Sequence, residues 1–228
     1  MGATFLKMLT ISEKLTVSLS EEIKYARLHY ATGDTLSAYD RAMELEKLAE
    51  QLVLFTRELP VCVGIPQARG QVEQVISECI PVEIGYTAEG WFSLRIPALL
   101  PKKSGGSANY VRSFLYPAMR DFFRERSPVR YRDCILIYRH IYDRDRPERQ
   151  MRDHDNIEIN MVSDIVAMYV MPDDGPAVCA HYYCSREGPE DRTEVYVVPR
   201  DDFPAWLELE KTMPDSGVLL LKNGPNDP

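Results

Sequence analysis

The segment between residues 152 and 176 constrains the fold most, because it joins a helical apolar pattern to acidic residues at both ends. Its apolar residues recur at three- and four-residue steps, from Ile157 through Met161 and Ile165 to Met168. That period is typical of an amphipathic helix with a broad buried face. The sequence therefore predicts a helix over residues 157–170, with one acidic cluster before it and another after it.

Five aspartates lie in or beside this predicted helix: Asp153, Asp155, Asp164, Asp173 and Asp174. Carboxylate oxygens are the hard ligands that Mg²⁺ prefers, usually one or two per ion together with water and substrate phosphates. One interpretation is therefore a Mg²⁺ site for phosphodiester chemistry. The alternative is that Asp155 or Asn156 caps the helix and Asp173–Asp174–Gly175 forms a turn. Both can hold together, because a capping aspartate can also face a metal ion.

The order D-x-D-N, then a helix, then D-D before a strand, resembles the signature of the RusA-like Holliday junction resolvases over residues 81–199. The resemblance implies a small dimeric α/β endonuclease, a hydrolase of DNA recombination and repair that uses Mg²⁺ to cut branched DNA. It implies that Asp153, Asp155 and Asp174 are the catalytic residues and the metal ligands. The family often has a lysine where this chain has Ile159. A second hypothesis is therefore a catalytically silent protein of the same fold that binds nucleic acid or a protein partner.

Charge is unevenly distributed along the chain. The net charge is −8, yet residues 101–152 hold thirteen lysines and arginines against six aspartates and glutamates. A basic segment that leads into an acidic motif suits an enzyme acting on a polyanion, because the cations hold phosphates and the carboxylates hold the metal. The side chains expected to contact DNA are Lys102, Lys103, Arg139, Arg149 and Arg152, with Asn156, Asp164 and Asp173 supporting the motif. The alternative is a solvated surface on which neighbouring arginines and aspartates neutralise each other.

Two sequence periods divide the chain. Residues 1–60 follow a helical period, interrupted by a stop at Gly33 and an N-cap at Asp34 or Thr35, and predict a hairpin of two helices over about 12–30 and 36–58. Residues 61–80 are interpreted as a linker. Residues 81–228 predict an α/β domain, in which segments 82–86 and 91–96 form a β-hairpin, 108–126 a helix and 133–142 a strand. The expected class is α+β, with a helical arm followed by a mixed sheet that carries two main helices.

The C-terminal part alternates strand and helix signals. Residues 177–185 and 193–199 predict the strands of a second hairpin, followed by a helix over 201–213 with Trp206 turned inward and a last strand at 217–221. Cys179 and His181 would share one strand face while Cys184 points to the other, so a zinc site is not favoured. His140 should lie on the same face as two tyrosines and is interpreted as a structural residue.

The predicted helix also separates the acidic clusters. A helix over residues 157–170 would be about 21 Å long, which places Asp174 far from Asp155 in one chain. A symmetric homodimer in which Asp174 reaches the partner's motif would solve this, as would a returning loop. The sequence has no export signal, no apolar run of about twenty residues and five scattered cysteines. These features predict a cytoplasmic protein with reduced thiols and no membrane partner.

Overall fold

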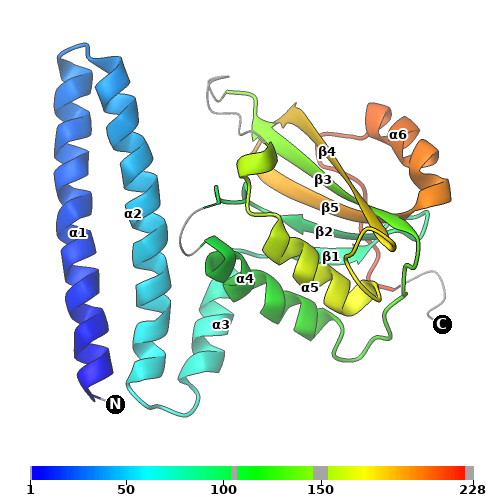
Figure 1. The fold of residues 1–228 in the computed structure, drawn as a ribbon, viewed down its shortest axis with the longest axis horizontal. Helices are drawn as coiled ribbons and strands as arrows, with labels where there is room; N and C mark the ends of the chain where they lie inside the picture. Colours follow the sequence, from blue (N-terminus) through cyan, green and yellow to red (C-terminus); the bar gives the residue numbers. More distant parts are fainter. Residues whose placement is uncertain (1, 104–106, 146–153, 224–228) are drawn as a thin grey trace. The chain divides into compact units, whose positions relative to one another are not determined.

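The computed structural model describes residues 2–103, 107–145 and 154–223 (Figure 1). The chain divides into two compact units, one formed by Met1–Val75 with Gly105–Tyr110 and the other by Ile76–Ser104 with Val111–Pro228. The predicted α+β class is confirmed, since helices and a mixed five-stranded sheet occur in one chain. Within the described ranges, no helix combines the length and the apolar character needed to cross a membrane.

Two long helices dominate the first unit: α1 (Gly2–Ala31) and α2 (Thr35–Cys62). The predicted break between them is confirmed. Gly33 has a φ of 80°, a left-handed conformation that glycine adopts without strain. The Asp34 carboxylate accepts a 3.1 Å hydrogen bond from the backbone N–H of Ser37 and so caps α2. The result is the expected αα-hairpin (Figure 1).

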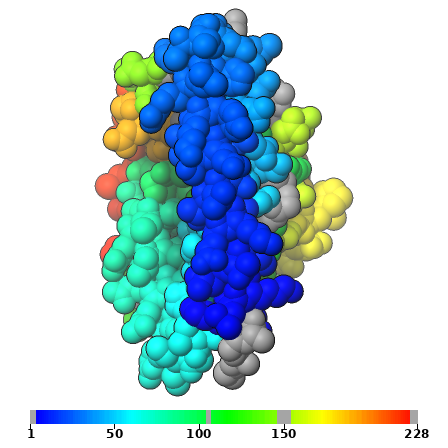
Figure 2. All heavy atoms as spheres, turned by 90° about the vertical axis from the view of Figure 1, so that its left-hand side faces the viewer, coloured from blue at the N-terminus to red at the C-terminus, as the bar shows by residue number. Residues whose placement is uncertain are grey.

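The hairpin buries little of its apolar surface. No residue of α2 is buried, and Ser12 is the only buried residue among the described side chains of α1. Large apolar side chains of α1 are exposed, among them Leu6, Val17 and Leu28. Figure 2 shows the side of α1 that is turned away from α2 along its whole length. Two helices alone cannot enclose a core, so most of their apolar residues remain half-buried.

A third helix, α3 (Ala68–Cys79), occupies most of the segment expected to be a linker. The irregular connection is confined to the few residues around Gly64 and Pro66, because these residues separate α2 from α3. The boundary between the two units then falls inside α3, between Val75 and Ile76. Glycine and proline here separate two helices and do not form a long flexible connection.

The second unit is built on a sheet with the order β1-β2-β5-β3-β4. The predicted first hairpin is confirmed as β1 (Glu83–Tyr86) and β2 (Phe92–Ile96). β3 (Cys134–Asp143) pairs in parallel with β4 (Cys179–Gly188), whereas β5 (Arg192–Pro199) pairs antiparallel with β2 and β3. The prediction that the last two strands form a hairpin was wrong. β3 lies between them, because it is buried on both faces and therefore takes an interior position in the sheet.

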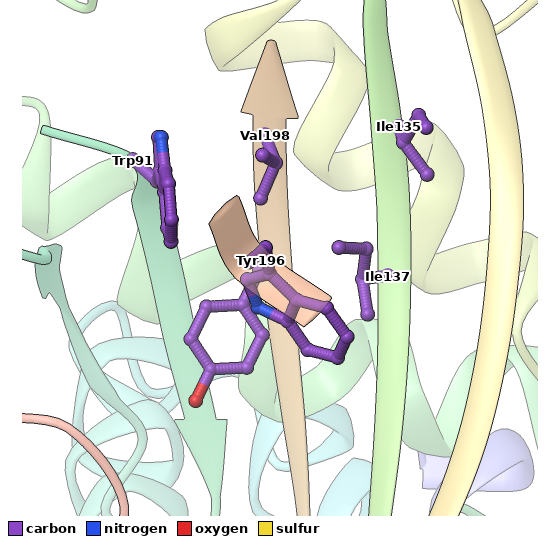
Figure 3. Packing of buried hydrophobic residues seen from close by; sticks show 6 residues of the cluster. Trp91, Ile135, Ile137, Tyr196 and Val198 are labelled. Carbon is purple, nitrogen blue, oxygen red and sulfur yellow. The ribbon is translucent and has the colours of Figure 1, made fainter. Parts of the chain in front are cut away.

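Helices cover both faces of this sheet (Figure 1). α4 (Ser107–Phe122) and α5 (Asn160–Val170) lie on one face, and α6 (Phe203–Thr212) lies on the other. α5 is the crossover that a parallel strand pair such as β3 and β4 requires. On the α6 side, Trp206 is fully buried in a cluster with Trp91, Ile137 and Tyr196, as its spacing predicted. Figure 3 shows the last three of these residues.

The last strand predicted at residues 217–221 does not form. Leu221 instead pairs with the sheet through an isolated bridge to Tyr86. Gly85 allows this close approach, because a β-carbon there would lie 2.5 Å from the carbonyl oxygen of Leu221.

Candidate active site

Two polar segments flank α5 and form the candidate site. The first is the 3₁₀ turn His154–Asn156, which follows β3 and contains Asp155. The second is the loop 171–178, which leads into β4 and contains Asp173 and Asp174. Three further predicted site residues lie outside the described residues: Asp153, Arg149 and Arg152.

The basic loop before α4 is bound to the first polar segment. The backbone N–H of Lys103 donates to the carbonyl oxygen of Asn156 at 2.7 Å, and Lys102 forms an isolated bridge with Ile157. Lys102, Lys103 and Asp155 are all exposed. Two ammonium groups and a carboxylate therefore lie at one edge of the unit, with Asn156 fixing the turn through its backbone.

The start of α5 differs from the prediction. The helix begins at Asn160, and its N-cap is Ile159, which makes no side-chain capping bond. The expectation that Asp155 or Asn156 caps the helix was therefore wrong. The 3₁₀ turn takes up residues 154–156, so the helix starts three residues later than the apolar period predicted. The Asp155 side chain stays exposed and is not used as a cap.

Asp174 faces the middle of α5. Its carboxylate lies within hydrogen-bonding reach of Asp164, and both line an open pocket of about 290 Å³ with Arg130, Met168 and Asp173. Partial burial and the nearby charge of Asp174 raise the pKa of Asp164, because each disfavours its ionised form. The Asp173 carboxylate accepts a 3.0 Å hydrogen bond from the backbone N–H of Asp174 and steadies the loop. Three of the five predicted aspartates are thus brought together.

A row of stacked rings connects the two segments across β3 and β4. It runs from His154 through Tyr183 to His181, with ring centroids 5.8 and 6.2 Å apart. Tyr138 and the buried His140 lie beside it on β3, each with a ring centroid 5.6 Å from its neighbour in the row. Tyr138, His140, His181 and Tyr183 occupy alternate positions of two strands in register, so their side chains share one face, onto which His154 stacks from the 3₁₀ turn. The prediction that His140 shares its face with tyrosines is confirmed.

Asp155 and Asp174 lie at opposite ends of this row. His154, the neighbour of Asp155 in the chain, places Nε2 2.9 Å from the hydroxyl of Ser185. At the other end, burial lowers the pKa of His181, while the Asp174 carboxylate acts in the opposite direction. Ser185 and His181 are four residues apart on β4, about 13 Å at the usual rise of a strand. The two acidic segments are thus apart in a single chain, although by less than the roughly 21 Å that the predicted helix length gave.

Arg139 is a structural residue, which corrects the expectation that it contacts DNA. It is 5% exposed and lies on the α6 face of β3. Its guanidinium donates to the carboxylates of Glu194 at 3.0 Å and of Glu210 at 3.4 Å. Arg192 donates to Glu194 at 2.8 Å, and these cations lower the pKa of Glu194 although burial opposes its ionisation. The guanidinium neutralises buried carboxylates and is not presented to a phosphate.

The pairing of Asp174 with Asp164 and the nearness of His181 were missed by sequence reasoning. Pro172 and the residues after it were a usable signal, because they end the helix and turn the chain back along it toward Asp164. The alternation of histidines and tyrosines along two separate strands was a second usable signal. Its meaning depends on the parallel register, which no local pattern specifies.

Fold and site together define an α+β protein in which a parallel β–α–β crossover carries acidic residues at both ends of its helix. The chain belongs to DUF6100, a family of unknown function whose model matches residues 2–220. The match spans both units, so the helical hairpin and the sheet belong to one family pattern. No curated protein and no solved structure matches the chain.

Proposed function

We propose that the second unit is a Mg²⁺-dependent endonuclease that cuts phosphodiesters in branched DNA. The observation that carries the proposal is the crossover β3–α5–β4, with Asp155 before the helix and Asp174 after it on one side of the sheet. The same order of acidic motif, helix, acidic pair and strand carries the resemblance to the RusA-like Holliday junction resolvases. Asp153, Asp155 and Asp174 would be the catalytic carboxylates.

The carboxylates near Asp174 fit Mg²⁺ by their chemistry. Among the described side chains, no set of three or more His, Cys, Asp or Glu is arranged to hold a metal ion. Mg²⁺, however, needs only one or two carboxylates when water and substrate phosphates supply its other ligands. A second negative charge beside Asp174 is disfavoured, as the raised pKa of Asp164 indicates, and a divalent cation relieves that repulsion. Bound Mg²⁺ would stabilise charge on the phosphate and activate a water molecule.

The chain's own cations would hold the nucleic acid. Lys102 and Lys103 are exposed beside Asp155, and Arg130 lines the pocket that contains Asp174. Because the whole chain carries a net charge of −8, attraction to DNA must come from such local groups. Burial lowers the pKa of His181, which favours the neutral imidazole, and a neutral imidazole next to Asp174 can accept a proton.

A homodimer is part of the proposal. The distance of about 13 Å between the ends of the ring row exceeds the roughly 4 Å between the ions of a two-metal site. Two copies related by a two-fold axis would supply complementary acidic segments and the two cutting units that paired cuts require. The exposed apolar residues of α1 and the half-buried seam of α2 offer a self-association surface, because two such hairpins complete a four-helix bundle.

A second candidate function is binding without cleavage. Ile159 favours it, because this residue stands where the family often has a lysine and is only 8% exposed. Its carbonyl oxygen accepts a 3.2 Å hydrogen bond from the hydroxyl of Tyr138. The position is therefore packed into the core and cannot serve a phosphate. In this candidate the same surface binds nucleic acid or a protein partner and leaves it uncut.

One experiment separates the two candidates. The purified full chain is incubated with a synthetic four-way DNA junction, with and without Mg²⁺, and both nicking and gel shift are recorded. Mg²⁺-dependent nicking that is lost in Asp174→Asn and Asp155→Asn supports the endonuclease. The matched control is Asp201→Asn, an exposed aspartate on a different turn, which should nick normally. A gel shift without nicking selects the binding protein. If neither nicking nor a gel shift is observed, both candidates are overturned.

A further inference from the structure

Two cysteines are partners at the first position of the parallel ladder between β3 and β4. Cys134 and Cys179 are opposite each other in register, so their side chains point to the same face of the sheet. Neighbouring strands lie about 4.8 Å apart. That spacing falls within the range of about 4.4–6.8 Å between the Cα atoms of a disulfide. The backbone at this position therefore already has the spacing that a cross-strand disulfide requires.

The two thiols also interact. The interaction between the two thiols raises the pKa of Cys134 and lowers the pKa of Cys179. Burial adds to the first shift and opposes the second. The sulfur of Met171 lies 3.4 Å from that of Cys134, and both cysteines are almost fully buried, at 0% and 3% exposure. Cys179 is therefore the cysteine of the pair that is better able to act as a thiolate.

The other cysteines are placed differently. All five are free thiols in this structure. Cys62 lies in α2, Cys79 is exposed at the end of α3, and Cys184 is opposite Arg139 in the β3–β4 register. Their positions make them controls for the reaction of the facing pair.

We propose that Cys134 and Cys179 form a reversible disulfide, with a small-molecule disulfide such as oxidised glutathione as the oxidant. The Cys179 thiolate attacks one sulfur of the oxidant, forms a mixed disulfide and releases one glutathione thiolate. The Cys134 thiolate then attacks the Cys179 sulfur and releases the second glutathione thiolate. The two protons of the cysteine thiols pass to these two thiolates, and the two electrons reduce the oxidant.

The bond would restrain the acidic loop that carries Asp173 and Asp174. That loop is tied to both cysteines, since the N–H of Cys179 donates to the carbonyl of Gly175 and the N–H of Cys134 donates to the carbonyl of Val178, each at 3.0 Å. A disulfide between the first residues of β3 and β4 would limit how far the loop can move. Any effect on cleavage rests on the proposed function, whereas disulfide formation does not.

Mass mapping of the full-length protein tests the disulfide directly. Oxidised glutathione is raised until the exposed Cys79 is fully modified, remaining thiols are blocked, and the chain is digested with trypsin. Cys134 lies in the peptide 133–139, and Cys179 lies in the peptide 153–186 together with Cys184. The expected product is these two peptides joined, lighter than their sum by two hydrogen atoms and separated again by a reductant.

Serine variants assign the bond. Cys184→Ser should keep the joined peptides, whereas Cys179→Ser should lose them. Two results would overturn the proposal. One is that Cys134 and Cys179 are both alkylated after denaturation, although Cys79 is fully modified. The other is that the joined peptides persist in Cys179→Ser. The wild-type result needs no activity and no variant, so failure of the proposed cleavage would leave this outcome unaffected.

Discussion

Replacing Arg139 with methionine tests whether this arginine stabilises the fold. The substitution keeps the length of the side chain but removes a buried cation from Glu194 and Glu210. Glu194 is 1% exposed at its side chain and would retain Arg192 and the hydroxyl of Tyr196, each at 2.8 Å. Breaking a buried ion pair from one side costs about 3–5 kcal/mol. Because Glu194 keeps these two partners, we expect the lower end, about 3 kcal/mol of lost unfolding free energy.

Tryptophan fluorescence during urea unfolding measures this loss of free energy in the second unit, which contains Arg139. Trp91 and Trp206 are the only tryptophans of the chain, and both belong to the second unit. The matched control is Arg200→Met, because Arg200 forms an ion pair with Asp133 at 2.6 Å but is exposed. Exposed pairs contribute about 0–1 kcal/mol, so this variant should unfold almost as the wild type does. Equal urea midpoints for Arg139→Met and Arg200→Met, with weaker DNA binding in the former, would refute the structural role.

Three further predictions concern the carboxylates and the cysteines. The second unit should lose stability as the pH falls below about 4.5, because arginines hold the pKa of Glu194 below that ordinary value when the chain is folded, and Glu194→Gln should flatten this acid-unfolding slope. Asp164→Asn should raise the unfolding free energy at pH 7 by about 0.5 kcal/mol, a value discounted for solvent exposure. The folded state raises the pKa of Asp164, so its stabilising contribution is present at low pH and is lost as the pH rises. A double-mutant cycle with Asp174→Asn should remove the gain. Oxidation that joins Cys134 to Cys179 should raise the unfolding free energy by at most about 4 kcal/mol, the loop-closure value for about 45 enclosed residues, when urea midpoints are compared with and without reductant.

Local signals predicted the elements whose structure is decided locally. Gly33 and Asp34 gave the break between α1 and α2, because a left-handed glycine and a capping carboxylate act within a few residues. The alternation around Gly90 gave the β1–β2 hairpin for the same reason. The pairing of β4 and β5 could not be found in this way. Their short connection suggested a hairpin, but the interior position of β3 between them depends on packing against both faces of the sheet.

The role of Arg139 shows why positive charge alone does not identify a nucleic-acid contact. Its strand alternation placed it on the same face as Ile135 and Ile137, so the sequence already indicated a cation on an apolar face. Such a position requires buried carboxylates, and these are Glu194 and Glu210. Both lie more than fifty residues further along the chain and on different elements, β5 and α6. Only the tertiary fold brings them together. A count of positive charge along the sequence therefore predicted a DNA contact for an arginine that stabilises the fold.

The same topology limits how the acidic segments can work. A parallel strand pair needs a crossover that returns the chain to the end where the first strand began, so the residues before and after the crossover helix lie at opposite ends of the strands. α5 has eleven residues, about 16 Å of helix, and it therefore separates Asp155 from Asp174. Asp164 lies within that helix and meets Asp174 in the same chain. In the proposed endonuclease, Asp164 and Asp173 would therefore be the described aspartates that share a cation with Asp174 inside one copy, whereas a role for Asp155 at the same ion would require a second copy of the chain.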